Sequence, residues 1–279
     1  MSHMKVGMGQ LLVEGGEPDR NLTRAEEMIQ DAADQDCQVI LLPECLDLGW
    51  THPSAKTEAQ TVPGAFSDRL CVSAHRHGIY VCAGLTEQED NRVYNSAIFI
   101  NPSGEILLKY RKINVLEVGL GFYTVGQSLG VIKTPLGTIG LNICADNYID
   151  SLDNGHMLAR MGAQIIFSPS SWTVDYSIID VEDPYRDKWY KPFFTLASLY
   201  DLVIISATSV GYIVGGPYEG KKMVGCSIAV GKEGVIAQGI YNEFASDLVI
   251  ADIEISQRNE KGTAIGEMLQ SKGYQIFTK

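Results

Sequence analysis

A turn between two apolar runs is encoded by Ser96-Ala-Ile-Phe-Ile-Asn-Pro-Ser-Gly104-Glu-Ile-Leu107, and the pattern returns in Cys226-Ser-Ile-Ala-Val-Gly-Lys-Glu-Gly234-Val-Ile-Ala237. Asn, Pro, Ser and Gly suit a tight reversal, so each segment predicts a β-hairpin. Aligning Gly104 with Gly234 gives an offset of 130 residues. The repetition predicts an internal duplication, although hairpins can also look alike by chance.

A second repetition has nearly the same offset. The run Val39-Ile-Leu-Leu-Pro43 is echoed by Ile165-Ile-Phe-Ser-Pro169, 126 residues later. Both are short apolar runs of the kind found in buried strands. We therefore predict two α/β halves, related by a pseudo-two-fold duplication. Each half contributes a sheet with helices on its outer face, and the two sheets pack face to face.

Apolar periodicity places the other elements. Helical spacing predicts helices at 21–36, 66–77, 152–161 and 184–200. Short apolar runs predict strands at 5–12, 39–42, 79–83, 94–100, 105–109, 131–134, 138–143, 164–167, 202–208, 224–230, 235–239 and 248–253. The polar stretch 256–279 is predicted to be a C-terminal tail that caps the fold or contacts a partner in an oligomer.

Size and composition describe an ordinary globular protein. The chain has 279 residues, of which 45% are hydrophobic and 20% charged. A net charge of −12 without a basic run argues against nucleic acid as a partner. No apolar stretch approaches the roughly 20 residues that cross a bilayer, so no membrane association is predicted. Residues 1–3 precede Met4 and resemble a vector remnant, and we expect a single domain over 4–255.

The cysteines favour a reducing compartment. No two of them form a C-x-x-C pair, and several lie in apolar runs. This pattern predicts reduced thiols in a cytoplasmic protein rather than a disulfide framework. The six cysteines are Cys37, Cys45, Cys71, Cys82, Cys144 and Cys226.

Three polar side chains follow predicted strands. Cys144 closes the run Thr138–Ile143 and Glu44 follows Pro43, at the carboxyl ends where α/β folds place reactive groups. Lys112 follows the first hairpin. A thiol can attack carbon, a desolvated carboxylate can act as a general base, and an ammonium can stabilise an oxyanion. Each also has an ordinary interpretation, as a buried thiol, a solvated turn carboxylate or a surface charge.

Together, and in this order, the three residues resemble the motifs of the nitrilase superfamily of carbon–nitrogen hydrolases. The resemblance spans roughly residues 4–255. It implies a four-layer αββα sandwich, a Glu44–Lys112–Cys144 triad, no metal, no organic cofactor and assembly into homodimers or larger homo-oligomers. The matching segments are Leu42-Pro-Glu44 through Gly49-Trp50, Asn95-Ser96, Tyr110-Arg-Lys112-Ile-Asn, Ile143-Cys144-Ala-Asp146 and Gly225-Cys-Ser227.

Two departures from relatives bear on the pocket. Many relatives continue after the cysteine with an aromatic residue, Asp and an Arg/Trp-Phe-Pro-Glu stretch, whereas here Cys144 is followed by Ala-Asp-Asn-Tyr-Ile-Asp150. The family often has a second pocket glutamate after the lysine. Glu117 is the only glutamate within 113–126, and it is a weaker match because its spacing to Gly126 fits poorly.

Further residues near predicted strand ends are candidates for substrate binding. Trp50, Tyr148 and Trp172 could contact the substrate, and packing in the core or at the rim explains them equally well. Asp146 and Asp175 could bind a cationic group, but a solvated or capping role is the simpler interpretation.

The predicted function is hydrolysis of an amide or N-carbamoyl bond in a small molecule. Cys144 would form a thioester, Glu44 would move the protons, and Lys112 with the backbone N–H of Ala145 would hold the oxyanion, releasing ammonia or an amine. A nitrilase that converts a nitrile to an acid, and a catalytically silent relative that acts as a binding or scaffold protein, remain alternatives.

Two other hydrolase classes fit the sequence poorly. A Cys–His hydrolase needs a histidine base, and no histidine lies at a predicted strand end. A metallohydrolase needs several ligands at defined spacing, and the closest histidine pair, His75-Arg-His77, has no accompanying ligand motif.

Overall fold

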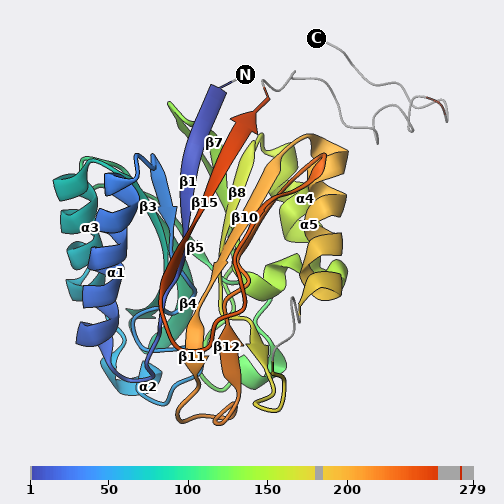
Figure 1. The fold of residues 1–279 in the computed structure, drawn as a ribbon. Coiled ribbons are helices and arrows are strands. Elements are labelled where there is room, and N and C mark those ends of the chain that lie inside the picture. The colour runs from blue at the N-terminus through green and yellow to red at the C-terminus, as the bar shows by residue number, and fades with distance from the viewer. Residues whose placement is uncertain (1, 180–184, 257–270, 272–279) are drawn as a thin grey trace.

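Two six-stranded sheets lie face to face, and helices cover their outer faces (Figure 1). This is a computed structural model that describes residues 2–179, 185–256 and 271. Helices α1 (Pro18–Asp34) and α3 (Ala65–His77) cover the first sheet, and α4 (Asp153–Arg160) and α5 (Arg186–Tyr200) cover the second. The predicted αββα sandwich is confirmed.

The first sheet has the strand order β15-β1-β2-β3-β4-β5. Its strands are β1 Ser2–Gln10, β2 Val39–Leu41, β3 Tyr80–Glu89, β4 Arg92–Ile100, β5 Ile106–Arg111 and β15 Asp247–Ile255. The second sheet has the order β14-β13-β10-β8-β7-β6. Its strands are β6 Val131–Thr134, β7 Gly137–Leu141, β8 Ile165–Ser170, β10 Val203–Thr208, β13 Ile228–Gly231 and β14 Gly234–Gln238.

The two sheets repeat one topology, which supports the predicted duplication. In the first, β1, β2 and β3 are parallel neighbours, and β4 and β5 follow antiparallel. In the second, β7, β8 and β10 are parallel, and β13 and β14 follow antiparallel. Strands β15 and β6 pair antiparallel with the first strand of each set. The two sequence repetitions therefore fall on equivalent strands, β2 with β8 and β4–β5 with β13–β14.

Strand β2 shows why its sequence is apolar without alternation. Val39 and Leu41 belong to the core between the two sheets, whereas Ile40 and Leu42 belong to the core beneath α1 and α3. Successive side chains of a strand point to opposite faces, so a strand buried on both faces needs apolar residues throughout. Complete burial of each such side chain is worth roughly 1.5–3 kcal/mol relative to exposure.

Local signals set the helix ends. Pro18 occupies the first turn of α1, where its missing N–H is not needed. Helix α3 ends at Gly78, whose φ of 66° is left-handed and suits glycine. Smaller elements complete the fold: α2 Ala55–Glu58, η1 Glu117–Gly119, η2 Cys144–Asn147, η3 Ile149–Ser151, β9 Thr173–Val174, β11 Val210–Tyr212 and β12 Lys222–Val224.

The structure corrects several sequence-based boundaries. The strand predicted at 224–230 is two strands, because Gly225 and Cys226 have positive φ values of 70° and 62° and break it. Strand β12 instead joins β11 and β9 in a separate small sheet. Strand β1 spans Ser2–Gln10 rather than the predicted 5–12, because β15 pairs with it over this whole range.

The predicted tail, 256–279, lies outside the described residues apart from Ser256 and Ser271. Within the described part of the chain, no helix combines the length and apolarity needed to span a bilayer.

Candidate active site

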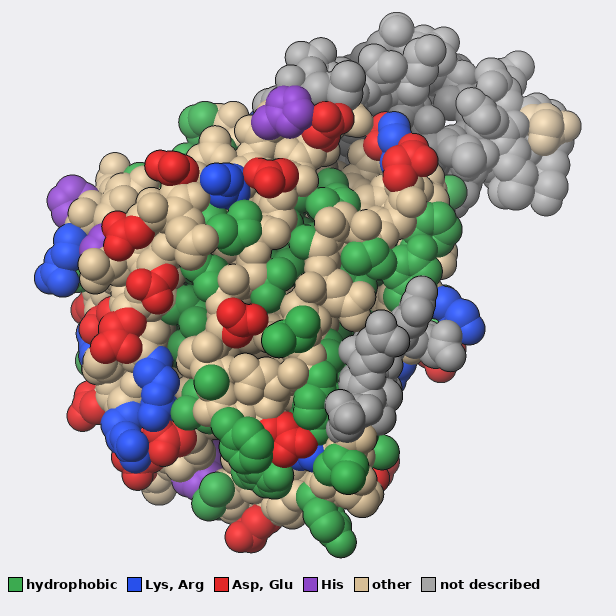
Figure 2. All heavy atoms as spheres, in the orientation of Figure 1, with side chains coloured by type: hydrophobic (Ala, Val, Ile, Leu, Met, Phe, Trp, Pro, Cys, Tyr) green, Lys and Arg blue, Asp and Glu red, His purple; other side chains and the backbone are tan. Residues whose placement is uncertain are grey.

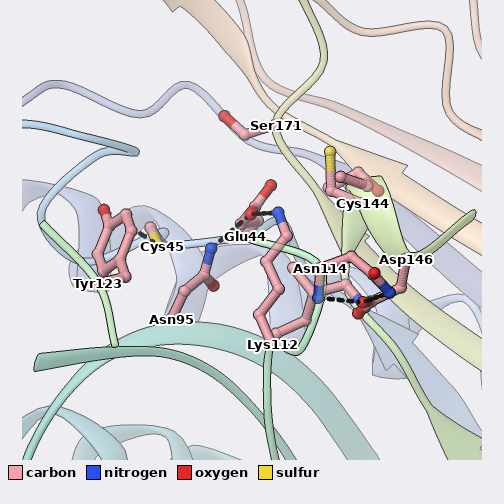
Figure 3. A network of polar contacts seen from close by, with 12 residues as sticks. Glu44, Cys45, Asn95, Lys112, Asn114, Tyr123, Cys144, Asp146 and Ser171 are labelled. Atoms are coloured by element: carbon pink, nitrogen blue, oxygen red, sulfur yellow. Dashed lines mark hydrogen bonds and ion pairs between the residues drawn. The ribbon is translucent and has the colours of Figure 1, made fainter. Parts of the chain in front are cut away.

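Glu44 and Lys112 meet at one end of the first sheet (Figure 3). Glu44 follows β2 and Pro43, and its N–H donates to the carbonyl of Ser170 at 3.2 Å, so its backbone is fixed against the second sheet. Lys112 follows β5, and its Nζ lies 2.6 Å from Glu44 Oε1. Both residues are almost fully buried, at 1% and 2% exposure. The two charges therefore neutralise each other inside the protein.

The two carboxylate oxygens of Glu44 have different surroundings. Oε1 accepts hydrogen bonds from Lys112 Nζ and from Asn95 Nδ2, the latter at 2.5 Å. Oε2 is buried and has no hydrogen-bond partner among the described residues. Since buried polar atoms are nearly always paired, an unpaired carboxylate oxygen is a candidate proton acceptor.

Cys144 faces this pair from the second sheet (Figure 3). It follows β7, begins the short helix η2 and has a φ of 44°, in the left-handed region that non-glycine residues rarely adopt. It is only 6% exposed and lines a cavity of about 190 Å³. The strained turn thus places a buried thiol at the wall of a small cavity.

The Cys144 thiol is protonated at neutral pH. Burial and the negative charge of Glu44 together raise the pKa of the thiol to about 12, because Lys112 and a hydrogen bond from the backbone of Ser171 offset them only in part. Burial alone would lower the pKa of Lys112, but the charges of Glu44, Cys144 and Asp146 outweigh burial and raise it. Lys112 therefore stays an ammonium, and the thiol needs a base before it can attack.

Asp146 connects the loop that carries Lys112 to the loop that carries Cys144 (Figure 3). Its Oδ1 accepts from the N–H and the Nδ2 of Asn114, at 3.0 and 2.8 Å, and its Oδ2 accepts from the N–H of Ile143 at 2.8 Å. Tyr110 OH also donates to Oδ2, at 2.7 Å. Asp146 is fully buried and bonded to neutral donors, so its role here is positioning rather than binding of a cation.

Two glycines allow the backbone of the site to pack closely. A Cβ on Gly84 would lie 2.5 Å from Glu44 Cα, and one on Gly126 would lie 2.0 Å from the carbonyl oxygen of Arg111. The N–H of Gly126 donates to the Lys112 carbonyl at 2.8 Å. Glycine at both positions therefore fixes the approach of the segments that carry Glu44 and Lys112.

The predicted aromatic residues line the cavity beside Cys144. Trp50, Tyr148 and Trp172 all contribute to its wall. Helix α5 and the segments around it supply wall residues that the sequence did not single out, among them Trp189. The remaining lining residues are Leu116, Ser171, Thr173, Tyr185, Lys188, Tyr218 and Lys221. A second cavity of about 480 Å³ shares Leu116, Tyr148 and Lys188 with the first and is also lined by Ala145.

Two predicted residues lie away from this group. Glu117 is exposed on η1 and is not among the described residues that line either cavity, whereas the preceding Leu116 lines both. The turn of η1 directs Glu117 to solvent, so the structure does not bring it to the triad. Asp175 is exposed and forms an ion pair with Lys221 at 2.6 Å.

The residues required by rival hydrolase classes are not gathered at the site. Within residues 2–179, 185–256 and 271, no histidine lines the Cys144 cavity, and no cluster of His, Cys, Asp and Glu has a metal-binding arrangement. His52 and His156 instead bond through Nδ1 to Ser54 Oγ and Tyr200 OH, at 2.7 and 2.8 Å.

Comparison with known proteins adds independent information. A family model for carbon–nitrogen hydrolases matches residues 5–261. The chain is 28% identical to the ω-amidase NIT2 of Danio rerio over 184 residues, which cover 62% of this chain and 65% of the relative. It is 32% identical to a nitrilase of Pyrococcus abyssi over 180 residues, which cover 62% of this chain and 67% of the relative. The match to the first relative therefore spans slightly less than two thirds of its length.

Solved structures share the fold. The amidase from Nesterenkonia sp. AN1 superposes with a TM-score of 0.77 at 18% identity, over 91% of this chain and 92% of the amidase.

Proposed function

Since the chain belongs to the carbon–nitrogen hydrolase family, we propose that it hydrolyses an amide-type carbon–nitrogen bond of a small molecule, with Cys144, Glu44 and Lys112 as the catalytic residues. The observation that carries the proposal is Glu44 Oε2, a buried oxygen with no hydrogen-bond partner among the residues that the structure describes. It belongs to a carboxylate whose other oxygen is held by Lys112, beside a thiol that lines a cavity.

The first half of the reaction forms a thioester. Glu44 takes the thiol proton as the sulfur attacks the carbonyl carbon, because the raised pKa keeps the thiol protonated until the substrate is bound. The oxyanion is stabilised by the Lys112 ammonium and by the N–H of Ala145. One such donor is worth roughly 3–4 kcal/mol of the barrier. Glu44 then passes its proton to the leaving nitrogen, and the carbon–nitrogen bond breaks.

The second half releases the acid. A water molecule enters after ammonia or an amine has left, and Glu44 takes its proton while the water oxygen attacks the thioester carbon. The carbon–sulfur bond then breaks, the thiol regains a proton from Glu44, and the acid departs. Asn95 supports both halves by holding Oε1, which leaves Oε2 available for proton transfer.

The first test is ammonia release from a panel of primary amides, N-carbamoyl compounds and nitriles. We expect Cys144→Ala to abolish turnover with an unchanged circular dichroism spectrum. Cys71→Ala, which removes a half-buried thiol from α3, should retain wild-type turnover. Intact-protein mass spectrometry should show an added acyl group on wild-type protein during turnover and none on Cys144→Ala. Full activity of Cys144→Ala would end the proposal.

Nitrile conversion and a silent scaffold are the weaker alternatives. The ω-amidase and amidase relatives favour an amide substrate over a nitrile. A buried base, a paired cation and a thiol at a cavity argue against a silent protein. Alkylation of Cys144 that a substrate amide blocks is expected of the enzyme, whereas a scaffold would show no such protection.

We also propose that the protein forms a homodimer or larger homo-oligomer. Hydrophobic side chains gather at the end of the molecule that carries β11 and β12 (Figure 2). Exposed apolar residues there include Tyr212, Val214 and Phe244, and the rings of Tyr212 and Phe244 lie 6.1 Å apart. Exposed apolar patches often mark protein interfaces. Light scattering at micromolar concentration should give at least twice the monomer mass, and a monomer would contradict this part of the proposal.

A further inference from the structure

Two buried asparagines flank the nucleophile, one on each side in the sequence. Asn142 comes two residues before Cys144, and Asn147 comes three residues after it. Their side-chain amides bond reciprocally: Asn142 Nδ2 donates to Asn147 Oδ1 at 2.6 Å, and Asn147 Nδ2 donates to Asn142 Oδ1 at 3.0 Å. Both residues are fully buried. This amide pair, Asn142 and Asn147, therefore closes a ring across the turn that carries Cys144.

The amide pair has no polar atom left for a ligand. Every oxygen and nitrogen atom of the two side chains takes part in a hydrogen bond. By contrast, Glu44 Oε2, the proposed proton acceptor, is buried without a partner among the described residues. A polar group that meets a substrate needs free hydrogen-bonding capacity, so the amide pair acts on the position of its neighbours and not as a binding group.

The backbone between the two asparagines is strained. Cys144 has a φ of 44°, and a non-glycine residue stays in this region only where its surroundings hold it there. The turn is the four-residue helix η2, which is too short to fix such a conformation alone. Asn147 Nδ2 also donates to the carbonyl oxygen of Cys144, at 3.4 Å. The amide pair thus contacts the strained residue directly.

The amide pair is anchored to strand β8, which lies beside β7 in the second sheet. Asn147 Nδ2 donates to Ser168 Oγ at 2.8 Å. The N–H of Asn142 donates to the carbonyl of Phe167 at 3.2 Å. One asparagine is tied to β8 through its side chain and the other through its backbone, so the pair fixes the turn relative to this strand.

The position of the turn relative to β8 decides what the sulfur meets. Ser171 directly follows β8, and its backbone N–H donates to the Cys144 sulfur. Glu44 faces the sulfur from the first sheet, and its N–H donates at 3.2 Å to the carbonyl of Ser170, the last residue of β8 (Figure 3). The donor to the thiol and the base are therefore both held at the end of β8. Holding the turn against this strand aligns the sulfur with both.

We propose that Asn142 and Asn147 are positioning residues, which hold the thiol of Cys144 in line with Glu44 for proton transfer. The inference rests on the proposed function, because it takes Glu44 as the base and Cys144 as the nucleophile. Both asparagines lie just outside the family-like segment 143–146, and Asn147 belongs to the stretch in which this chain departs from many relatives. A small displacement of a reacting group lowers kcat without changing the cavity wall that binds the substrate.

The first measurement separates alignment of the thiol from stability of the fold. Asn142→Leu or Asn147→Leu leaves one buried amide without its partner, so each single variant should unfold at a lower urea concentration and lose kcat at least about tenfold. Asn142→Leu/Asn147→Leu removes both amides, so its urea midpoint should recover at least about half of that loss. Its kcat should stay at least about tenfold below wild type, with KM changed by less than about threefold.

Asn21→Leu is the matched control for the loss of a buried amide. Asn21 lies on α1, is also fully buried, and donates through Nδ2 to the carbonyls of Glu14 and Asp47, at 2.7 and 2.8 Å. Its replacement should lower the urea midpoint about as much as a single variant of the amide pair does, because similar buried hydrogen bonds are lost. The kcat should stay within about twofold of wild type, because α1 covers the outer face of the first sheet.

The second measurement needs no amide substrate. Methyl methanethiosulfonate modifies thiols, and peptide mass spectrometry follows the rate at Cys144. In otherwise wild-type protein, Glu44→Gln should slow this modification at least about tenfold, because the thiol loses its base. In the Asn142→Leu/Asn147→Leu background the same substitution should slow it less than about threefold, because a misaligned thiol no longer depends on Glu44.

The outcomes separate this inference from the proposed function. The inference would be overturned, with amide hydrolysis left standing, by a double variant that recovers both stability and kcat or keeps its full dependence on Glu44. An equally large loss of kcat in Asn21→Leu would overturn it as well. If Glu44→Gln failed to slow modification of otherwise wild-type protein, Glu44 would not be the base, and both proposals would be rejected. A stable double variant with a low kcat and no dependence on Glu44 would establish the positioning role.

Discussion

The ends of β2 and β8 occupy equivalent places in the two halves, yet only one carries a charge. Each strand is followed or closed by proline and a polar residue, Pro43-Glu44 in the first half and Pro169-Ser170 in the second. The two polar residues touch, because the Glu44 N–H donates to the Ser170 carbonyl at 3.2 Å. Ser170 Oγ shares a hydrogen bond with Ser206 Oγ at 2.7 Å, so its hydroxyl is paired.

This difference shows how a symmetric fold acquires one asymmetric site. The first half supplies the base and the cation, Glu44 and Lys112, whereas the second half supplies the nucleophile Cys144 and much of the cavity wall. A charged base at both equivalent ends would place two carboxylates close together in the interior, which is costly without two cations. Serine fills the second place with a neutral, paired hydroxyl.

The largest expected effect comes from Glu44→Gln, compared with Ser170→Ala. Glutamine keeps the shape of the side chain but cannot accept the thiol proton, so we expect kcat to fall by about 10³-fold or more. Ser170→Ala removes the equivalent polar group and should change kcat by less than about threefold, with a loss of about 1 kcal/mol of stability from the unpaired Ser206. Comparable losses in both variants would mean that the two ends contribute equally to catalysis.

The second effect concerns the cation. Lys112→Met removes an oxyanion donor, and kcat should fall by about 10²- to 10³-fold. The variant also leaves Glu44 buried without a counter-ion, which should lower the free energy of unfolding by about 3–5 kcal/mol. Urea denaturation and steady-state kinetics measure the two quantities separately.

The double variant Glu44→Gln/Lys112→Met provides the control for that stability loss. It removes both charges, so it should be more stable than Lys112→Met alone, while remaining inactive. If the double variant were the less stable of the two, the buried charge of Glu44 would not be the cause of the loss.

The third effect tests the contact between the halves. Asp146→Asn replaces the carboxylate that accepts hydrogen bonds from Asn114, beside Lys112, and from Ile143, beside Cys144. An amide can accept through only one oxygen, so the two loops are held less firmly and we expect kcat to fall by about 10- to 100-fold. Alkylation of Cys144 should remain as fast in this variant as in the wild type, because the thiol of Cys144 and its base Glu44 are both still present.

Asn154→Ala is the matched control for Asp146→Asn. Asn154 Nδ2 donates to the same carboxylate at 3.0 Å. Asn154 belongs to helix α4 and not to either of the loops that carry Lys112 and Cys144. The kcat should change by less than about threefold, because the contact between the two catalytic loops is kept. An equally large loss in Asn154→Ala would show that Asp146 acts through packing of α4 rather than through the loops.

Much of the site could be predicted because its residues follow strands that are easy to recognise. Glu44 follows the wholly apolar run 39–43, and Cys144 follows the run 138–143, whose apolar residues alternate with Thr138, Gly140 and Asn142. The carboxyl ends of such strands are where α/β folds expose polar groups. The hairpin turns repeat closely enough to reveal the duplication. The αββα layers then follow from two sheets that each have an apolar inner face.

The remainder depends on contacts that only the folded chain creates. Trp189 and Lys188 lie on α5, and nothing in local periodicity indicates that this helix reaches the Cys144 cavity. The part that Asn95 plays depends on a hydrogen bond to Glu44, a residue 51 positions away in sequence. The break at Cys226 was missed for a related reason: a positive φ at a cysteine is imposed by tertiary packing, not by the residue itself.

The last prediction concerns Asp47→Asn, which should have the smallest effect on turnover and the clearest effect on how the free energy of unfolding depends on pH. Asp47 is fully buried and bonds only to residues of the first half. Burial raises its pKa from 3.8 to about 6, although Thr86 and Leu48 donate hydrogen bonds to it. Because the folded state then holds this proton more tightly than the unfolded state, the contribution of Asp47 to stability rises as the pH falls from about 7 to 4, by about 3 kcal/mol.

Asp47→Asn has no proton to lose, so this pH dependence should vanish in the variant. As the pH rises from 4 to 8, the free energy of unfolding of the variant should therefore increase by about 3 kcal/mol relative to that of the wild type. Urea denaturation across this range measures the shift, with Asp31→Asn on the exposed face of α1 as the control that should show none. A pH-independent difference for Asp47→Asn would mean that the hydrogen bonds from Thr86 and Leu48 compensate fully for burial.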